Sequence, residues 1–361
     1  MIRKIWIPFT FIIFSSATIL AQNHSGRWSR EEVNHWYARQ GWIRGSNFIA
    51  STADNQLEMW QAATFDTATI DRELGYAQSI GFNAMRVFLH HVAWQEDPAS
   101  FKARMKTYLK IAHSHGIRTL FVFFDDCWND HYQAGPQPPP KPGVHNSRWL
   151  RDPGTLYYTE PLLKDTLEAY VKDILSTFKH DPRILCWDLY NEPGNSNYGS
   201  RSLDLLTRVF EWARQVHPDQ PLTAGLWNAN LTELNHFQLT HDDVITYHNY
   251  DPRAEHQKVI DSLKPYGRPV ICTEYMARPR GSTFATIMPM LKQEHVGAIN
   301  WGFVAGRTNT IFAWDTPIPD GKEPAVWFHD IFRKDGTPYS TQEITLIKSL
   351  TGIHSPAKKI K

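Results

Sequence analysis

The chain has 361 residues, enough for one large domain, and no Gly/Ser-rich or charge-rich stretch divides it. Its 38 Lys and Arg residues nearly balance its 37 Asp and Glu residues, which argues against nucleic acid or another polyanion as the main partner. A neutral ligand fits this balance better. The 14 Trp residues fall mostly near predicted strand ends, where their rings could stack on the apolar faces of such a ligand.

The first 21 residues read as a signal peptide. Arg3 and Lys4 precede an apolar run that ends at Phe14, and small residues follow up to Ala21. A membrane anchor is the alternative, but the run is shorter than the roughly 20 residues that a membrane span needs. We therefore expect a secreted or periplasmic protein whose mature chain, residues 22–361, is a single domain without a membrane insertion.

Three cysteines are present, Cys127, Cys186 and Cys272. Cys186 and Cys272 lie inside apolar, strand-like runs and are expected to be small core residues. Cys127 follows a predicted strand end, where it could line a site or fill a structural role. No cysteine–histidine spacing is typical of zinc, so we expect neither a metal nor another cofactor.

Strand-like and helix-like segments alternate along the chain after a short helix that begins at Ser29-x-x-Glu32. Eight strand candidates are found: Trp42–Ile49, Ala84–Leu89, Thr119–Phe124, Ile184–Tyr190, Leu222–Leu226, Val244–His248, Pro269–Thr273 and Gly297–Phe303. They are short and apolar on both faces, as buried parallel strands are. Helices with recognisable ends lie between them, such as the one that Asp97-Pro98 opens and Gly116 closes.

Eight such units predict an α/β protein, a single (β/α)8 TIM barrel. A doubly wound open sheet is the alternative. That fold would place a glycine-rich loop after its first strand to bind a dinucleotide, whereas Gly41 and Gly45 lie before or within the first strand here. The barrel is therefore the preferred prediction.

Two connections are longer than a barrel needs. The connection after the third strand, residues 125–158, contains Pro136, Pro138, Pro139, Pro140 and Pro142, and the connection after the eighth strand runs past Trp314, Pro317 and Pro319. Long loops at the C-terminal rim of a barrel usually serve function. We interpret both as walls of a pocket or cleft, with plain surface decoration as the alternative.

Two glutamates stand where predicted strands end. Glu192 follows the fourth strand and Glu274 follows the seventh. In a barrel, the C-terminal ends of the strands meet at one mouth, so we expect the two carboxyls to face each other there. Hydrolysis of a glycosidic bond requires such a pair, one carboxyl to protonate the leaving oxygen and one to attack the sugar. A single glutamate of this kind would more often be a solvated rim residue.

Other polar and aromatic residues are predicted at the same mouth. Each has a structural explanation on its own: a strand arginine could pair with Asp188, a histidine could be a core residue, and a tryptophan could fill the barrel. Together they predict a ring of substrate-binding groups with one aromatic platform. The candidates are Arg86, Asp125, Asn191, His248, Tyr250 and Trp301.

The sequence resembles the clan A glycoside hydrolases and, within that clan, the family 5 cellulase-like enzymes. Asn191-Glu192-Pro193 matches the acid/base motif of the clan, and Thr273-Glu274-Tyr275 matches its nucleophile. The resemblance extends from Trp42 to Trp301. The family also keeps an arginine, a histidine, a tyrosine and a tryptophan where this chain has Arg86, His248, Tyr250 and Trp301. One departure is Asp125, since the family usually has histidine at the end of the third strand.

The resemblance implies an exported retaining β-glycoside hydrolase that cleaves β-linked oligosaccharides or polysaccharides by double displacement. Arg86 and Tyr250 would keep Glu274 charged as the nucleophile, and Glu192 would hold a proton as the acid. Asn191 would bind the sugar 2-hydroxyl, and Trp301 would stack under the ring that is cleaved. A retaining mechanism predicts carboxyls about 5–5.5 Å apart.

Two other classes of protein are considered. A non-catalytic carbohydrate-binding barrel would keep the aromatic platform without turnover. A metal-dependent hydrolase would typically carry His-x-His on its first strand, where Ser46-Asn47-Phe48 stands here. Its ligands would come from His90, His91, Asp125, Asp126 and His248. Glucan, mannan, xylan and shorter β-glycosides all remain open as substrates, as does endo or exo action, and we expect a monomer.

Overall fold

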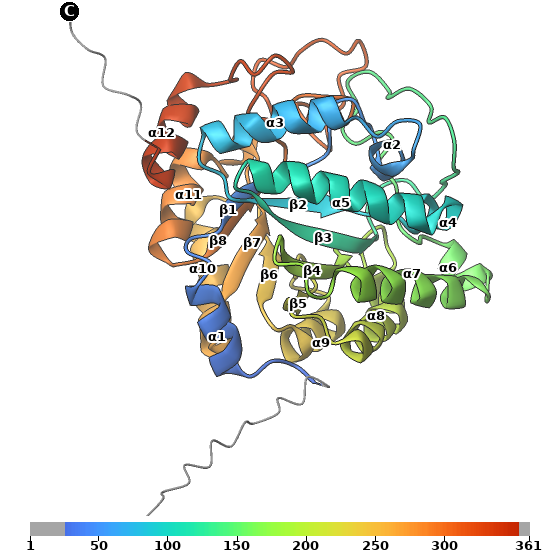
Figure 1. Ribbon diagram of the computed structural model, residues 1–361. Coiled ribbons are helices and arrows are strands. Elements are labelled where there is room, and N and C mark those ends of the chain that lie inside the picture. Colours follow the sequence, from blue (N-terminus) through green and yellow to red (C-terminus); the bar gives the residue numbers. More distant parts are fainter. Residues whose placement is uncertain (1–25, 354–361) are drawn as a thin grey trace, which may run out of the picture.

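Eight parallel strands form a barrel at the centre of the computed structural model, which describes residues 26–353 (Figure 1). The predicted signal peptide lies outside these residues. The strands are β1 Arg44–Asn47, β2 Ala84–Phe88, β3 Arg118–Asp125, β4 Ile184–Asn191, β5 Leu222–Thr223, β6 Ile245–His248, β7 Val270–Glu274 and β8 Gly297–Asn300. Each coincides with a predicted strand, although most are shorter than predicted.

The sheet runs in the order β5-β4-β3-β2-β1-β8-β7-β6, and neighbouring strands pair in parallel. Its two edges are joined beyond the short strand β5. The Leu226 amide donates to the Thr246 carbonyl at 3.0 Å, and the His248 amide donates to the Leu226 carbonyl at 2.8 Å. These bonds close the sheet, which confirms the (β/α)8 barrel and makes the open-sheet alternative wrong.

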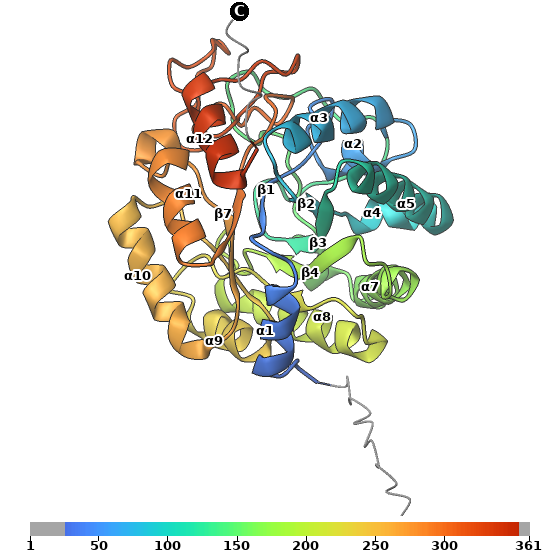
Figure 2. The same ribbon diagram turned by 60° about the vertical axis from the view of Figure 1, so that its left-hand side comes forward.

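Helices surround the barrel (Figure 2). They are α1 Arg30–Ala38, α2 Gln56–Trp60, α3 Thr67–Ser79, α4 His91–Glu96, α5 Pro98–Ser114, α6 Leu156–Thr159, α7 Leu163–Phe178, α8 Leu203–Val216, α9 Thr232–His241, α10 Arg253–Leu263, α11 Phe284–Gln293 and α12 Thr341–Thr351. Short 3-10 turns lie at Gly199–Ser202, Lys264–Tyr266 and Arg278–Arg280. None of the helices in residues 26–353 is long and apolar enough to cross a bilayer.

The sequence signals at the helix ends act as predicted. The Asp97 carboxylate accepts a hydrogen bond from the Ser100 amide at 3.0 Å at the start of α5, and Gly116 with φ +71° follows its end. Ser29 caps α1 in the same way, accepting from the Glu32 amide at 3.1 Å. These caps satisfy amides that the first helical turn leaves without partners.

The N-terminal end of the barrel is filled, so the opposite end is the one available to a ligand. Val33 and Trp36 of α1 belong to one buried apolar cluster with Leu120, Cys186 and Ile271 of the strands. At the C-terminal end the loops after β3 and β8 run without helix or strand over residues 126–155 and 301–340. The two long loops therefore stand at the rim, as predicted.

Candidate active site

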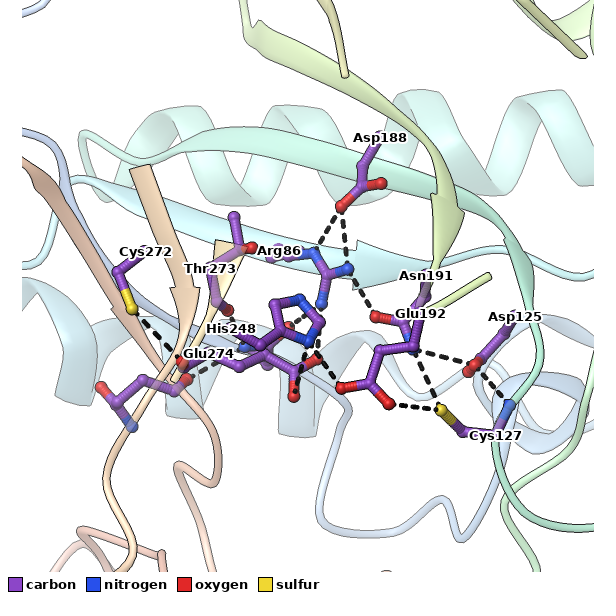
Figure 3. A network of polar contacts seen from close by, with 12 residues as sticks. Arg86, Asp125, Cys127, Asp188, Asn191, Glu192, His248, Cys272, Thr273 and Glu274 are labelled. Atoms are coloured by element: carbon purple, nitrogen blue, oxygen red, sulfur yellow. Dashed lines mark hydrogen bonds and ion pairs between the residues drawn. The ribbon is translucent and has the colours of Figure 1, made fainter. Parts of the chain in front are cut away.

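Glu192 and Glu274 meet at the C-terminal mouth of the barrel, with His248 between them (Figure 3). The His248 Nδ1 atom lies 2.7 Å from Glu192 Oε1 and 3.5 Å from Glu274 Oε2. One oxygen of each carboxyl and a nitrogen of the ring lie within 4.8 Å of one another. The barrel thus brings together two side chains that are 82 positions apart in the sequence (274 − 192).

The Glu192 backbone is in an unusual conformation, with φ +46° directly after β4. A non-glycine residue in the left-handed region is uncommon and is often found at functional sites. Asp126 holds the turn that follows: it accepts hydrogen bonds from the Gly194 amide at 2.8 Å and the Ser202 hydroxyl at 2.6 Å. Asn195 in this turn donates to Glu192 Oε2 at 2.5 Å. The turn therefore aims the carboxyl as well as carrying it.

Arg86 is completely buried under the two glutamates. Its guanidinium donates to Glu274 Oε1 at 2.9 Å, to Asp188 Oδ2 at 2.9 Å and to Asn191 Oδ1 at 2.7 Å. The structural pairing with Asp188 and the predicted contact with Glu274 are thus both present. Because one rigid fork holds three acceptors from β4 and β7, Arg86 fixes the spacing of the site.

Asp125 stands behind Asn191 and does not line the pocket. Its Oδ1 accepts from Asn191 Nδ2 at 2.9 Å and from the Cys127 amide at 2.9 Å, and its Oδ2 accepts from Trp149 Nε1 at 2.7 Å. Burial raises the pKa of Asp125 to about 7 despite these hydrogen bonds. The geometry therefore gives Asp125 the task of orienting Asn191 and Trp149, in place of the predicted contact with the substrate.

Cys127 contacts the acid/base candidate directly. Its Sγ donates to Glu192 Oε2 at 3.1 Å and accepts from Asn191 Nδ2 at 3.4 Å. Burial raises the pKa of the Cys127 thiol well above its usual value, and the charge of Glu192 adds to this effect. The thiol is therefore neutral and acts as a hydrogen-bond donor. Of the two roles considered for Cys127, lining the site is the one that the structure supports.

The two glutamates are electrostatically coupled. Burial works to raise the pKa of Glu192, but hydrogen bonds from His248, Cys127 and Asn195 overcome it, so that this pKa is lowered. Burial and the charge of Glu192 raise the pKa of Glu274 against the opposing effects of His248, Arg86 and Tyr250, whose hydroxyl donates at 2.7 Å. The predicted order was the reverse. It was wrong for the free site because it counted the donors to Glu274 and missed those to Glu192.

A pocket of about 550 Å³ opens above the pair. Five predicted residues line it, namely Asn191, Glu192, Tyr250, Glu274 and Trp301, whereas Arg86, Asp125 and His248 lie behind its surface. Cys127, considered from the sequence as a residue that could line a site, lines it too. The other lining residues were not predicted: Trp128, His145, Asn146, Trp149, Asn195, Ser196, Trp227 and Trp314. All of these are in loops after strands. Their only signal was the abundance of Trp and the length of two loops.

Neighbouring aromatic rings fix the orientation of the Trp301 side chain. Its ring packs edge-on against Trp149 at a centroid distance of 5.3 Å and against Phe88 at 5.8 Å. Only 8% of Trp301 is exposed. Tyr250 is fixed in a similar way by Trp314, with ring centroids 4.9 Å apart. These contacts pre-orient the aromatic walls before any ligand is bound.

The ligand set of the metal-dependent alternative is not brought together. His90 and His91 lie with Asp152 in a separate buried cluster, in which the His91 amide donates to Asp152 at 2.7 Å and the His91 ring also contacts this carboxylate. His248 belongs to the glutamate pair, and Asp125 and Asp126 are engaged by the donors described above. The residues proposed as metal ligands are thus divided among different hydrogen-bond networks.

Comparison with known proteins agrees with this geometry. The cellulase model of glycosyl hydrolase family 5 matches residues 53–305, more than half of the chain. The chain belongs to glycosyl hydrolase family 5. Among relatives of this family 5 protein, mannan endo-1,4-β-mannosidase F from Aspergillus clavatus is 24% identical over 132 residues. That segment is 36% of this chain and 28% of the relative, so the match spans less than a third of that protein.

Solved structures show the same fold at low sequence identity. The endo-β-1,4-mannanase from Thermotoga petrophila is 15% identical, with a TM-score of 0.57 over 89% of this chain and 78% of that one. An exo-β-1,4-mannosidase from Opitutaceae bacterium strain TAV5 is 17% identical, with a TM-score of 0.59 over 86% of this chain and 59% of that one. Both comparisons support the barrel. In this family 5 chain, Asp125 is the last residue of β3, where the family usually has histidine.

Proposed function

We propose that the protein is an exported retaining β-glycoside hydrolase, with β-mannosides as the first substrates to test. The single observation that carries the proposal is the pair Glu192 and Glu274, with oxygens and the His248 ring within 4.8 Å. Retaining enzymes hold their carboxyls about 5–5.5 Å apart, and inverting enzymes about 6.5–9.5 Å apart to admit a water. The β-mannoside preference rests on the names of the relatives and of the solved structures.

In the proposed first step, Glu274 attacks the anomeric carbon and forms a glycosyl ester, while the bond from that carbon to the leaving oxygen breaks. Glu192 gives its proton to the leaving oxygen. Because Arg86 and Tyr250 donate to the two oxygens of Glu274, they hold the attacking carboxylate in place. Asn191, fixed by Arg86 and Asp125, would bind the sugar 2-hydroxyl.

The second step returns the proton to Glu192. Glu274 carries no charge in the ester, so the pKa of Glu192 falls and Glu192 is present as a carboxylate. This carboxylate takes a proton from the incoming water. The water oxygen bonds to the anomeric carbon as the ester bond breaks. Hydrogen bonds from His248, Cys127 and Asn195 lower the pKa of Glu192, so the bound substrate must favour the protonated form of Glu192 before the first step.

Aryl β-glycosides test the proposal. Glu274→Ala should abolish hydrolysis of aryl β-mannoside, with azide restoring part of the rate through an α-glycosyl azide product. Glu192→Ala should slow poor leaving groups far more than good ones, because only the former need the acid. NMR of the earliest product should show the β-anomer. An inverted product would refute double displacement, and an unchanged rate in Glu274→Ala would refute the assigned nucleophile.

A further inference from the structure

The two long rim loops are fastened to each other by hydrogen bonds. The Asn146 amide donates to the Thr308 carbonyl at 2.8 Å, and the Ile318 amide donates to the Gly143 carbonyl at 3.0 Å. Asn309 Nδ2 adds bonds to the backbone carbonyls of residues 141 and 144, at 2.9 and 3.2 Å. In Figures 1 and 2 the green loop after β3 accordingly lies beside the orange-red loop after β8. We call residues 141–147 and 307–318 the rim wall.

The segment that follows β1 holds both of the loops that carry the rim wall. Asn55 donates to Gln137 at 3.0 Å, and Gln61 accepts from the Gly135 amide at 2.6 Å. On the other loop, Arg307 forms salt bridges with Asp54 and Glu58, both at 3.1 Å. The wall therefore joins the loops after β3 and β8, and both loops are held by the segment after β1.

Its position relative to the two glutamates determines what it blocks. The acid stands beside the leaving group in a retaining hydrolase, so the leaving group must extend past Glu192. On that side, the pocket is lined by Asn195, Ser196 and Trp227, all partly exposed. The sugar that is transferred extends the opposite way, toward Trp301 and Trp149. His145 and Asn146 of the rim wall line the pocket, as Trp149 and Trp301 do.

Within residues 26–353, the pocket lining near the rim wall carries no cation. No Lys or Arg lines this pocket in the described part of the chain, and its acidic lining residues are Glu192 and Glu274. His145 Nδ1 donates to the Phe312 carbonyl at 2.9 Å, and burial lowers the pKa of His145 to about 4, so its ring is neutral at physiological pH. A terminal residue bearing a carboxylate would have no cation to meet there. The chemistry suits a neutral pyranose ring stacked among Trp side chains.

We infer that the enzyme acts from the non-reducing end of a β-linked glycan and releases one neutral monosaccharide per event. This inference rests on the proposed function and adds to it the mode of cleavage. The rim wall occupies the space that a second sugar on the transferred side would need, whereas the side beyond Glu192 is open to a longer leaving group. Short oligosaccharides and chain ends are thus substrates, and the interior of a polysaccharide is not.

Hexasaccharides labelled at the reducing end give a direct test. With β-1,4-linked manno-, gluco- and xylo-hexaoses, the earliest labelled product of the wild type should be the pentamer, accompanied by free monosaccharide. Labelled dimers, trimers or tetramers ahead of the pentamer would overturn the inference but leave the proposed function intact. Failure to cleave any of these substrates or any aryl β-glycoside would overturn both.

Gly143 offers a way to loosen the wall. An added Cβ at this residue would lie 1.6 Å from the Ile318 carbonyl oxygen, and the backbone has φ +66°. Gly135→Ala is the matched control: Gly135 lies in the same loop with φ +97°, but nothing lies within 4 Å of an added Cβ. Both variants carry backbone strain, and only the first separates the two loops.

Gly143→Ala should raise the share of products longer than one residue several-fold, while Gly135→Ala should keep the wild-type pattern. If Gly143→Ala does not fold, Asn309→Ala removes two hydrogen bonds of the wall without adding an atom. A folded variant with a demonstrably mobile wall, measured by hydrogen exchange at residues 141–147, that still releases only single residues would overturn the inference. Longer products without faster hydrogen exchange at residues 141–147 would also overturn the inference.

Discussion

Replacing Arg86 by Met should be among the most damaging changes to the stability of this barrel. The guanidinium is completely buried and donates to Asp188 and Glu274, both at 2.9 Å, so its loss leaves two buried carboxylates without a cation. Removing one partner of a buried ion pair costs about 3–5 kcal/mol. Since the free energy of unfolding of a domain is only about 5–15 kcal/mol, this cost is a large part of the total stability.

The deficit should depend on pH in a defined direction. Burial already raises the pKa of both Asp188 and Glu274 in the wild type, and loss of Arg86 would raise both further. A carboxyl whose pKa is higher in the folded than in the unfolded state stabilises the fold at low pH, and this stabilisation is lost as pH rises through the folded pKa. The Arg86→Met deficit should therefore grow as the pH rises and shrink as the pH falls.

Urea unfolding of the wild type and Arg86→Met between pH 5 and 8 measures this effect. Arg208→Met is the matched control, because Arg208 pairs with Asp204 at 3.2 Å on the surface and such pairs contribute at most about 1 kcal/mol. Arg86→Lys keeps the charge but cannot span the same acceptors, so it should fall between wild type and Arg86→Met. A cost below about 1 kcal/mol, or one that grows as pH falls, would refute the reasoning.

Three further predictions concern activity. Cys127→Ala removes a donor to Glu192, so the pKa of Glu192 should rise and the acidic limb of the free-enzyme pH–rate profile should move to higher pH. Cys127→Ser should stay closer to the wild type, and an unmoved profile for Cys127→Ala would contradict the contact. Asp125→Asn places an NH2 donor against Asn191 or Trp149, which are donors themselves, so one hydrogen bond is lost. Steady-state kinetics should show kcat/KM lowered by about 10–100-fold, or roughly 1.4–2.8 kcal/mol. Activity should survive treatment with a chelator, since every proposed step uses side chains of this chain; a loss restored by a divalent ion would revive the metal-dependent alternative.

The strand pattern and the strand-end glutamates carried most of the predictive information. Buried parallel strands are apolar on both faces, so β2, β3 and β4 stand out as short continuous runs in the sequence. Once eight such runs are counted, the geometry of a barrel fixes which end of each strand faces the site. Glu192, Glu274 and Arg86 could therefore be brought together without coordinates.

Contacts that depend on the path of a loop could not be predicted in this way. Cys127 contacts Glu192 from the irregular chain after β3, and Asn195 does so from the turn after β4. No residue pattern announces either contact, since each joins side chains through an irregular backbone. The order of the two glutamate pKa values depends on these contacts and on burial, and for that reason the sequence predicted it in the wrong direction.

The three cysteines have a consequence for the environment in which the enzyme can work. Cys127, Cys186 and Cys272 are all buried free thiols, and burial raises the pKa of each. Oxidants and disulfides react with the thiolate, which these residues do not form at ordinary pH. Outside the cytoplasm, where the proposed export would place the protein, the thiol beside the acid/base should stay reduced without help from a thioredoxin or glutathione system.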